Sequence, residues 1–594
     1  MDFLPVNKQD MENRGWDQCD FILISGDAYV DHPSWGGAVI SRVLEDAGFK
    51  VGVLAQPDWK DIEAFRILGE PRLAFLVTAG NIDSMVNHYT VNKKYRNRDL
   101  YSPGGKAGTC PDRATIVYTG KAKAAYKGKP VIIGGIEASL RRLSHYDYWS
   151  NKVRRSILFD SKADMLIYGM GERQIRNIAK LMNKGVPLSN MTNIRGTVFR
   201  TSSIEKVKEH ISLPSFEEII INKKSYGDSF AVQYKNTDPH YGKILVEKTG
   251  NQWAVQNPPE FPLSTEEFDK VYELPYTKTA HPSYDKLGGV PALKEIQFSL
   301  IHNRGCYGNC SFCALTFHQG RIVTARSNES VVNEAVKLKA IKGFKGNIHD
   351  VGGPTADFSG PSCNKQGKSG SCPDKQCLFP KPCKNLNTDH STYLELLRSL
   401  RKIDGVKKVF IRSGVRFDYM LAENDDRFFK EICEHHISGQ LKIAPEHVST
   451  KVLNIMGKPD HKVFEKFIGK YQKINGELGK DQFFVPYFIS SHPGSGLNEA
   501  IELAEYLRDL HFIPEQVQDF YPTPGTLSTA IYYTGIHPLT GEKVFVPRSP
   551  EDKQMQRALL QFTKRENKTL VLKALRKAGR TDLIGNGHKC LVRK

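Results

Sequence analysis

Residues 304–313 read Arg304-Gly305-Cys306-Tyr307-Gly308-Asn309-Cys310-Ser311-Phe312-Cys313, and this stretch decides which fold to expect. Its three cysteines are spaced C-x3-C-x2-C. Thiolates are soft ligands that favour iron–sulfur clusters, zinc or copper(I). Three thiols so close together in the chain therefore predict a metal centre held by Cys306, Cys310 and Cys313.

The nature of the metal follows from the number of ligands. A four-iron cluster held by only three cysteines keeps one iron free for another molecule, whereas zinc takes four protein ligands. Zinc would need His302 or His318 as its fourth ligand, and structural zinc sites usually add a second, distant cysteine pair, which does not follow Cys313 closely. We therefore expect a [4Fe-4S] cluster; zinc and unligated buried thiols are the alternatives.

The motif resembles that of the radical S-adenosylmethionine (radical SAM) superfamily, with the aromatic Phe312 before the third cysteine and an expected strand at 296–301 before the first. The resemblance implies that S-adenosylmethionine binds the open iron through its amino and carboxylate groups. One-electron reduction would then yield a 5′-deoxyadenosyl radical that abstracts hydrogen from a substrate. An electron donor such as flavodoxin or ferredoxin is implied as well, while the substrate stays unknown.

The size and composition of the chain exclude several classes of protein. Its 594 residues suffice for about three or four domains, and its mean hydropathy is −0.43. No apolar run approaches the roughly 18 residues that span a bilayer, so no membrane partner is expected. The first residues lack a secretory signal, which predicts a cytoplasmic protein whose eleven cysteines are ligands or reduced thiols.

Residues 1–224 predict a doubly wound α/β domain. Apolar segments that end in glycine or turn residues alternate with helical ones, and parallel strands are expected at 20–25, 51–54, 73–77, 130–135 and 163–169. In such a domain, ligands bind at the carboxyl ends of the strands.

This half resembles the cobalamin-binding domains that precede many radical enzymes, notably at 134–138 and 169–172. The cobalt-ligating D-x-H-x-x-G of those domains is absent, since the nearest stretch, 27–36, has its acids and histidine at other spacings. Cobalamin is therefore not expected, and the domain is expected to dock or to bind substrate. A cobalamin-dependent radical methyltransferase stays an alternative function.

The rest of the chain predicts three further regions. Residues 225–288 read as a β insertion and connector, residues 289–540 as a partial (β/α)6 radical SAM barrel, and residues 541–594 as a small basic helical tail. The barrel carries a cysteine-rich insertion at 359–388. The order of these motifs, with the stretches 443–447 and 519–526, makes the whole chain resemble the YgiQ (UPF0313) family.

The resemblance also assigns residues to the S-adenosylmethionine site. Gly352 and Gly353 end a strand and would offer backbone carbonyls to the methionyl ammonium. Ser413 and Arg416 follow the next strand and would meet the ribose and the methionyl carboxylate, the latter through the guanidinium fork. Glu446 ends a third strand and is the candidate for a further cofactor contact.

A second group of cysteines lies in the insertion. Cys363, Cys372, Cys377 and Cys383 fall within a segment of 21 residues that is rich in Gly, Ser, Lys and Pro. Such a segment buries too little apolar surface to order itself, and a metal could order it. Zinc or an auxiliary iron–sulfur cluster is expected here, with unligated thiols as the alternative.

The charge of the chain predicts an anionic partner. The formal net charge is +19, and residues 541–594 carry 14 basic against 5 acidic side chains at roughly helical apolar spacing. RNA is therefore a candidate partner. A basic nucleic-acid-binding protein with structural metal sites is the alternative from a different functional class.

Overall fold

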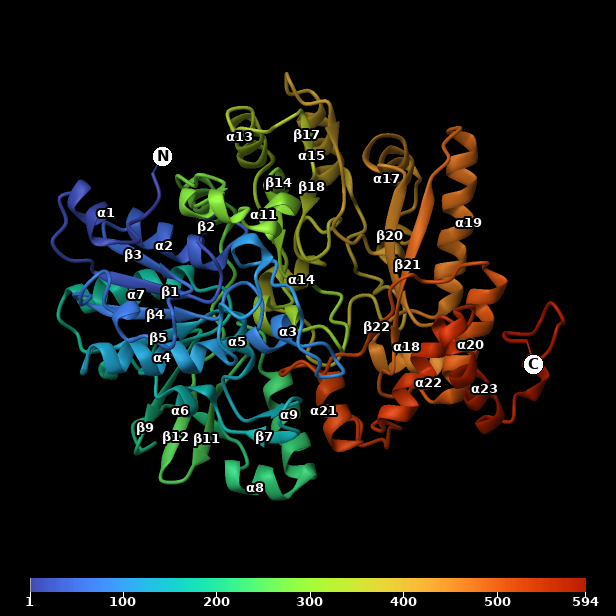
Figure 1. Cartoon of the computed structure of the whole chain (residues 1–594), viewed down its shortest axis with the longest axis horizontal. Helices are drawn as coiled ribbons and strands as arrows, with labels where there is room; N and C mark the ends of the chain where they lie inside the picture. Colours follow the sequence, from blue (N-terminus) through green and yellow to red (C-terminus); the bar gives the residue numbers. More distant parts are fainter. Residues whose placement is uncertain (1, 594) are drawn as a thin grey trace.

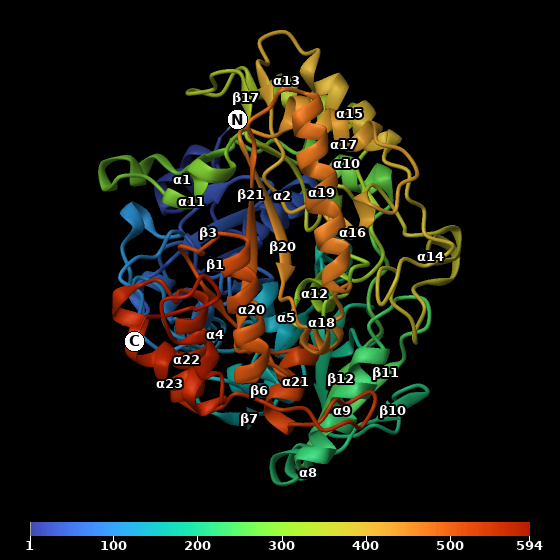
Figure 2. The same ribbon diagram turned by 90° about the vertical axis from the view of Figure 1, so that its right-hand side faces the viewer.

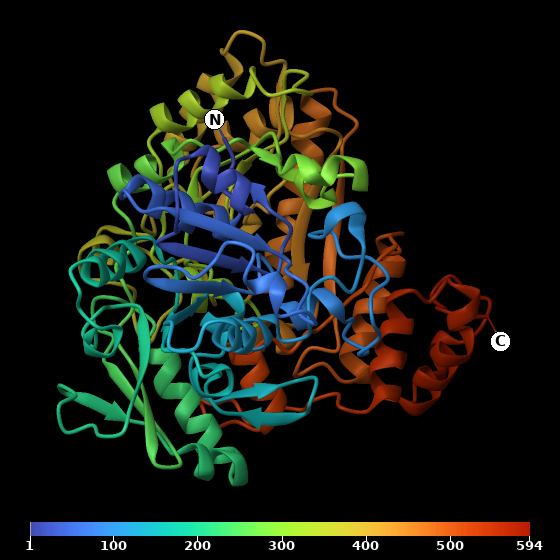
Figure 3. The ribbon, with the colours of Figure 1, turned by 60° about the vertical axis from the view of Figure 1, so that its left-hand side comes forward.

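The computed structural model describes residues 2–593, and its first half is built on one nine-stranded sheet (Figure 3). From one edge to the other, the strands are β10 (His210–Ser212), β11 (Ile244–Thr249), β12 (Gln252–Gln256), β9 (Thr197–Thr201), β8 (Met165–Ile167), β5 (Val131–Gly134), β4 (Ala74–Thr78), β1 (Phe21–Ser25) and β3 (Val51–Ala55).

The centre of this sheet is parallel. β1 pairs with both β3 and β4, β4 with β5, and β5 with β8, all in parallel register. These strands read as continuous apolar runs because helices cover both faces of the sheet. The predicted doubly wound domain is confirmed.

The covering helices form two layers. On one face, α2 (Gly36–Asp46) and α7 (Glu172–Asn183) pack together against the sheet, and on the other lie α4 (Ala114–Ala125) and α6 (Ile157–Ser161). Each helix packs apolar residues against the sheet, and α2 and α7 also bury the polar side chains of Arg42 and Glu172.

The strands expected within 225–288 are present, but they form no sheet of their own. β11 and β12 make an antiparallel hairpin that joins the first sheet through β9. Hydrogen bonding to an existing edge satisfies backbone groups that an isolated hairpin would leave to water. The remaining connector includes α10 (Thr265–Glu273) and α11 (Pro291–Ile296).

The second half is a partial barrel of short parallel strands, as predicted (Figure 1). The expected strand at 296–301 is shorter than predicted, because Pro291 starts a helix that continues to Ile296. The strands are β14 (Ser299–Ile301), β17 and β18 (Asn347–Ile348 and Asp350–Gly352), β19 (Lys408–Val409), β20 (Gln440–Glu446), β21 (Phe483–Ser490) and β22 (Gln518–Asp519).

Helices cover the outside of the barrel and tie its end to the first unit (Figure 2). The covering helices are α13 (Asn328–Leu338), α15 (Ser391–Arg401), α19 (His461–Glu477) and α20 (Leu497–Asp509). Beyond β22, α21 (Leu527–Thr534) packs on α9 (Lys223–Lys235), so the chain returns to the first unit.

The basic tail folds onto the barrel. α22 (Pro550–Leu560) and α23 (Lys568–Lys577) share an apolar core with α20. Several of their cations pair within the chain: Arg557 with Asp519, Lys573 with Glu551 and Lys577 with Asp552. Part of the charge that predicted an RNA partner is thus neutralised, and that partner stays a prediction.

The helices of residues 2–593 include none with both the length and the apolar character needed to cross a bilayer.

Buried Glu247 in β11 generates a prediction about pH. Its carboxyl group is inaccessible, accepts hydrogen bonds from the amide and hydroxyl of Ser144, and has its pKa raised by burial from 4.5 to about 7. Between pH 4.5 and 7 the unfolded chain releases this proton while the folded chain keeps it, so stability should fall as pH rises.

The variant Glu247→Gln should therefore flatten the dependence of unfolding free energy on pH by about 3 kcal/mol over this interval. Chemical denaturation at pH 5, 6 and 7 measures it, with exposed Glu205→Gln as the control. Equal slopes for wild type and Glu247→Gln would contradict the prediction.

Candidate functional site

The cysteine loop lies between β15 (Asn303–Arg304) and α12 (Leu315–Gln319). Gly305 starts the loop with φ of +86°, and a Cβ there would stand 2.3 Å from the carbonyl oxygen of Ile322. The Cys306 amide donates to the Gly320 carbonyl at 3.2 Å, and the Cys313 amide to the Cys310 carbonyl at 3.0 Å. These bonds hold the loop against the strand end in one conformation.

The three thiols are half-buried and lie on one short loop. Burial, with smaller contributions from Cys306, Cys310 and Glu446, raises the pKa of Cys313 to about 12. Burial also raises the pKa of Cys306. Cys306 and Cys310 both lie beside the Arg416 guanidinium, and thiols gathered in this way suit a cation, because bound metal deprotonates a coordinating thiol outright. The donor set therefore fits an iron–sulfur cluster.

A zinc site requires that all of its ligand side chains converge on one ion, which a cluster of several irons does not require. Within residues 2–593, no three His, Cys, Asp or Glu side chains gather in an arrangement that could hold one metal ion. Zinc needs sulfur atoms at about 2.3 Å from one centre, whereas the cysteines of a cluster bind different irons and stand further apart.

The histidines named as zinc ligands have other partners. His302 Nε2 lies 2.8 Å from the carbonyl oxygen of Ala356, and the ring stacks on Tyr393. His318 Nδ1 lies 3.0 Å from the hydroxyl of Ser139 in the first unit. Burial lowers the pKa of both rings to about 4.

Arg416 lies over the cysteine loop. Its Nη1 donates to Cys310 Sγ at 3.2 Å, while Nε and Nη2 bond the two oxygens of Asp418 at 2.8 and 2.6 Å. Gly308 makes room for this contact, since a Cβ there would stand 2.9 Å from Arg416 Nη1. The guanidinium thus opposes thiolate charge and is itself balanced by Asp418.

Glu446 is the other charged group beside the thiols. It ends β20 with φ of +71° and is 8% exposed. Burial raises its pKa to about 7, against the opposing effects of Lys458 and Arg416. A carboxyl group placed this way can hold or release a proton close to neutral pH.

Gly352, Gly353 and Ser413 come together at two strand ends. A Cβ on Gly352 would meet Ser413 Oγ at 2.4 Å, and one on Gly353 would meet Asn303 Oδ1 at 2.2 Å. The Gly352 carbonyl accepts from the His302 amide at 2.9 Å, and the Ser413 hydroxyl donates to Asp350. Both glycines are required by close packing, which a plain strand-end turn does not explain.

The glycine turn reaches the cysteine loop through Thr355. Its hydroxyl lies 3.6 Å from Cys306 Sγ. The side-chain amide of Asn303 donates to the backbone carbonyls of Thr355 and Phe358 at 3.0 and 2.7 Å. These two bonds join the turn to β15. These contacts connect the glycine turn after β18 to β15 and to the cysteine loop.

A large cavity of about 920 Å³ opens beside this structure. The first unit lines it with residues at the carboxyl ends of its parallel strands, and the barrel lines it with its own strand ends and α12. Representative residues are Thr78, Gly135 and Gly169 from the sheet and Gly353, Ser413 and Leu441 from the barrel. The cavity lies where a doubly wound fold is expected to bind its ligands.

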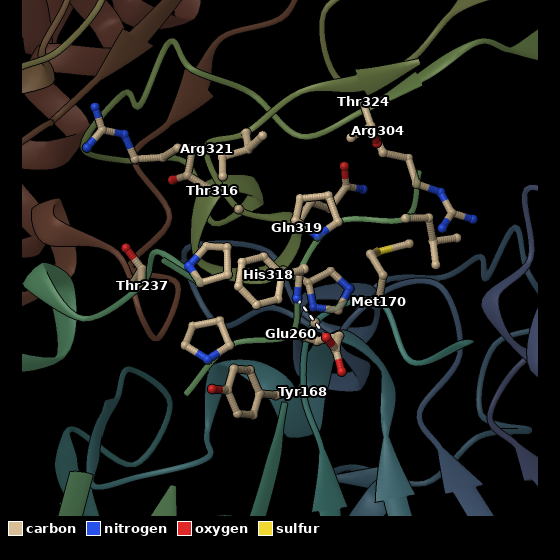
Figure 4. A pocket seen from close by; sticks show the side chains of 18 of the residues that line it. Tyr168, Met170, Thr237, Glu260, Arg304, Thr316, His318, Gln319, Arg321 and Thr324 are labelled. Carbon is tan, nitrogen blue, oxygen red and sulfur yellow. Dashed lines mark hydrogen bonds between the residues drawn. The ribbon is translucent and has the colours of Figure 1, made fainter. Parts of the chain in front are cut away.

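A smaller cavity of about 70 Å³ lies between the two units, with Arg304, Gln319 and Thr324 on one side and Tyr168 and Glu260 on the other (Figure 4). Its surroundings are tightly packed. Arg304 pairs with Glu172 of α7 at 2.5 Å, and the Arg142 guanidinium lies 3.6 Å from the Phe317 ring centroid. These contacts fix α12 against the first unit.

Sequence reasoning missed the residues that support the site. They are Asn303, Asp350, Thr355 and Asp418. Asp418 had a signal in the sequence, since it stands two residues after Arg416. The others had none, because their partners lie far away in the chain.

The comparisons with known proteins agree with this architecture. Residues 3–299 match the family described as Radical SAM N-terminal, residues 300–507 match the Radical SAM superfamily, and residues 515–594 match a domain of unknown function, DUF3362. A UPF0313 protein of Clostridium botulinum (strain Kyoto / Type A2) is 59% identical over 592 residues, 100% of this chain and 92% of the relative. The chain belongs to the UPF0313 family.

Other UPF0313 relatives show the same extent of similarity. The protein of Clostridium perfringens (strain 13 / Type A) is 58% identical over 100% of this chain and 89% of its own length. The superfamily match makes this UPF0313 chain a radical SAM enzyme, and it implies a [4Fe-4S] cluster and S-adenosylmethionine as cofactors.

Two solved structures have a similar course. The radical SAM methyltransferase TsrM of Kitasatospora setae, with cobalamin and [4Fe-4S] cluster bound, is 12% identical with a TM-score of 0.49, over 94% of this chain and 99% of that chain. The cobalamin-dependent radical enzyme OxsB, with aqua-cobalamin bound, is 13% identical with a TM-score of 0.46, over 96% of this chain and 63% of that chain.

The Arg416–Asp418 pair generates a prediction about stability. Asp418 is 2% exposed, so Asp418→Ala leaves the Arg416 guanidinium buried without its carboxylate. We expect a loss of about 3–5 kcal/mol in the free energy of unfolding, measured on the metal-free protein in guanidinium chloride.

The pair Asp425–Arg427 is a matched control with the same spacing and an exposed position. Asp425→Ala should have little measurable effect, because water solvates both ions. Similar losses for the two variants would contradict the prediction.

Proposed function

We propose that this UPF0313 chain binds a [4Fe-4S] cluster through Cys306, Cys310 and Cys313 and cleaves S-adenosylmethionine reductively. The observation that carries the proposal is the half-buried cysteine loop beneath Arg416, next to strand ends that open on a cavity of about 920 Å³. When bound, the cluster supplies the electron that breaks a carbon–sulfur bond and leaves a 5′-deoxyadenosyl radical.

The residues of the chain position the cofactor. The close packing of Gly352 and Gly353 brings backbone to the edge of the cavity, where their carbonyls can receive the methionyl ammonium. Ser413, which is hydrogen-bonded to Asp350 and lines the cavity, is proposed to contact the ribose. Arg416 is already bonded to Asp418 and Cys310, which favours a role in balancing thiolate charge over binding the methionyl carboxylate.

The cavity is the proposed substrate site. Its position between the two units shields a reactive radical from bulk water, which limits side reactions. Glu446 lies beside Cys313 with a pKa near 7 and is proposed as the further cofactor contact. The one-electron donor is proposed to be a flavodoxin or ferredoxin.

A second candidate function is radical methyl transfer with cobalamin. The observation that favours it is the size of the cavity and its lining, where Gly134, Gly135, Gly169 and Gly171 let a broad, flat ligand approach the strand ends. His32 does not line this cavity; it is 1% exposed, and its Nδ1 accepts from the Ser34 amide. A corrinoid would therefore bind without cobalt ligation by His32.

Anaerobic reconstitution with iron and sulfide tests the main proposal. Wild type reduced with dithionite in the presence of S-adenosylmethionine should form 5′-deoxyadenosine, and Cys306→Ala/Cys310→Ala/Cys313→Ala should form none. Cys590→Ala, at a half-buried thiol in the tail, is the control and should match wild type. A protein that loads only zinc would overturn the proposal.

Product analysis and absorption spectra separate the second candidate from the first. A corrinoid enzyme should retain added hydroxocobalamin through gel filtration and form S-adenosylhomocysteine. Gly135→Leu should abolish this retention, because an added Cβ would stand 2.4 Å from Thr78 Oγ1 and the leucine side chain would displace backbone or fill the cavity edge. Retention by the Gly135→Leu variant, or no retention by wild type, would exclude cobalamin from this cavity.

A further inference from the structure

The cysteine-rich insertion is anchored to the segment that follows the cysteine motif. Arg321 donates to the carbonyls of Cys372 and Lys375, both at 2.8 Å. On the other side, the Ser371 amide donates to Asp238 of the first unit at 2.7 Å. The insertion is thus held in a defined place although it contains little apolar surface of its own.

The thiols of the insertion lie near one another. Cys377 Sγ donates to Ser362 Oγ at 3.2 Å, next to Cys363. Gln366 joins the neighbours of Cys363 and Cys372, because its side-chain oxygen accepts from the Ser362 amide at 2.7 Å and its side-chain nitrogen donates to Ser371 Oγ at 3.0 Å. The Cys383 amide donates to the Cys377 carbonyl at 2.8 Å, which brings the fourth cysteine to the same place.

A layer of aromatic side chains separates this group from the cysteine motif. Tyr307 stacks on Phe358 with ring centroids 3.7 Å apart, and Tyr419 packs on the edge of Phe358 at 5.2 Å. Cys306 of the motif and Cys377 of the insertion both pack against this cluster. The two groups of cysteines are therefore neighbours across a single packed layer.

We infer that Cys363, Cys372, Cys377 and Cys383 hold a second iron–sulfur cluster that receives electrons from an acidic donor protein and passes them toward the cysteine motif. Four thiolates complete a cluster with no open iron, which suits electron transfer rather than substrate binding. Each turnover moves one electron: the donor is oxidised by one electron, the motif centre is reduced by one, and no proton or bond moves in the insertion.

The surface of the insertion fits such a donor. Residues 359–388 carry five lysines and one acidic residue, and all five lysines are exposed: Lys365, Lys368, Lys375, Lys381 and Lys384. Cys383 is exposed among them. A basic patch around a redox centre attracts and orients a donor with an acidic surface.

This inference rests on the proposed function for the fate of the electron, but the second centre itself can be tested without turnover. The reconstituted variant Cys306→Ser/Cys310→Ser/Cys313→Ser should keep about four of the roughly eight irons of wild type and show the paramagnetic signal of a reduced cluster. Zinc or no metal in this variant would overturn the inference.

The reciprocal variant Cys363→Ser/Cys372→Ser/Cys377→Ser/Cys383→Ser should also keep about four irons, and the control Cys590→Ser about eight. Equal iron in the reciprocal variant and in wild type would overturn the inference. If the reciprocal variant fails to fold, the iron content of the motif variant still decides the question.

Oxidation of flavodoxin hydroquinone by the reconstituted protein, followed by absorbance without S-adenosylmethionine, tests the donor surface. Lys381→Glu/Lys384→Glu should slow it at least about tenfold, and added salt should slow wild type. The control Lys286→Glu/Lys294→Glu reverses two exposed lysines around α11, on the opposite side of the molecule from α14 (Asn364–Ser369) (Figure 2). Equal slowing by both pairs would overturn the donor surface.

The two proposals can fail separately. A wild type that forms no 5′-deoxyadenosine with dithionite, while the motif variant keeps its cluster, would refute the proposed function and leave the second centre standing. A wild type that cleaves S-adenosylmethionine with dithionite, while the motif variant holds no iron, would support the proposed function and refute the second centre.

Discussion

The site depends on one constraint: the carboxyl ends of the parallel strands of the first unit and of β14, β18 and β19 in the barrel face a common cavity, and the cysteine loop must lie at their junction. Parallel strands present their carboxyl ends at one edge, so each unit supplies loops to that edge. The Arg304–Glu172 pair and the packing of Arg142 on Phe317 hold α12 and its loop against the first unit. Residues from both halves of the chain therefore line the same cavity.

Charge compensation is the second requirement of this arrangement. Partial burial without a cation disfavours the ionisation of Cys306 and Cys313 and raises the pKa of both thiols. Arg416 supplies one fixed positive charge against Cys310, and Asp418 prevents that guanidinium from being buried unpaired. A metal centre would supply the remaining positive charge, so binding it and completing the electrostatics of the site are the same event.

Close packing explains the glycines that sequence reasoning assigned to cofactor binding. Gly352 and Gly353 have no room for a side chain because Ser413 and Asn303 stand where their Cβ atoms would be. The same packing that excludes a side chain exposes backbone at the cavity edge. Structural need and proposed function therefore coincide at these positions, and a substitution would disturb both.

The accuracy of each sequence prediction depended on whether its signal lay within a short segment or involved residues far apart in the chain. The doubly wound domain was predictable because each of its strands is a local apolar run, and it is confirmed. The start of β14 was misjudged, because apolar residues at 296–298 suit a helix end as well as a strand. The hairpin β11–β12 was expected as strands, but its pairing with β9 involves residues about fifty positions away.

Local order in the chain was enough to predict the metal-binding chemistry of Cys306, Cys310 and Cys313, because ligand type and spacing are properties of a short segment. It was also enough to predict the α/β class and family resemblance. Only the tertiary structure decided that Arg416 lies on Cys310, that Thr355 touches Cys306 and that the insertion lies one aromatic layer from the motif. The first contact joins residues 106 positions apart in the chain, and the second joins residues 49 positions apart. Tertiary packing, and not sequence periodicity, brings such residues together.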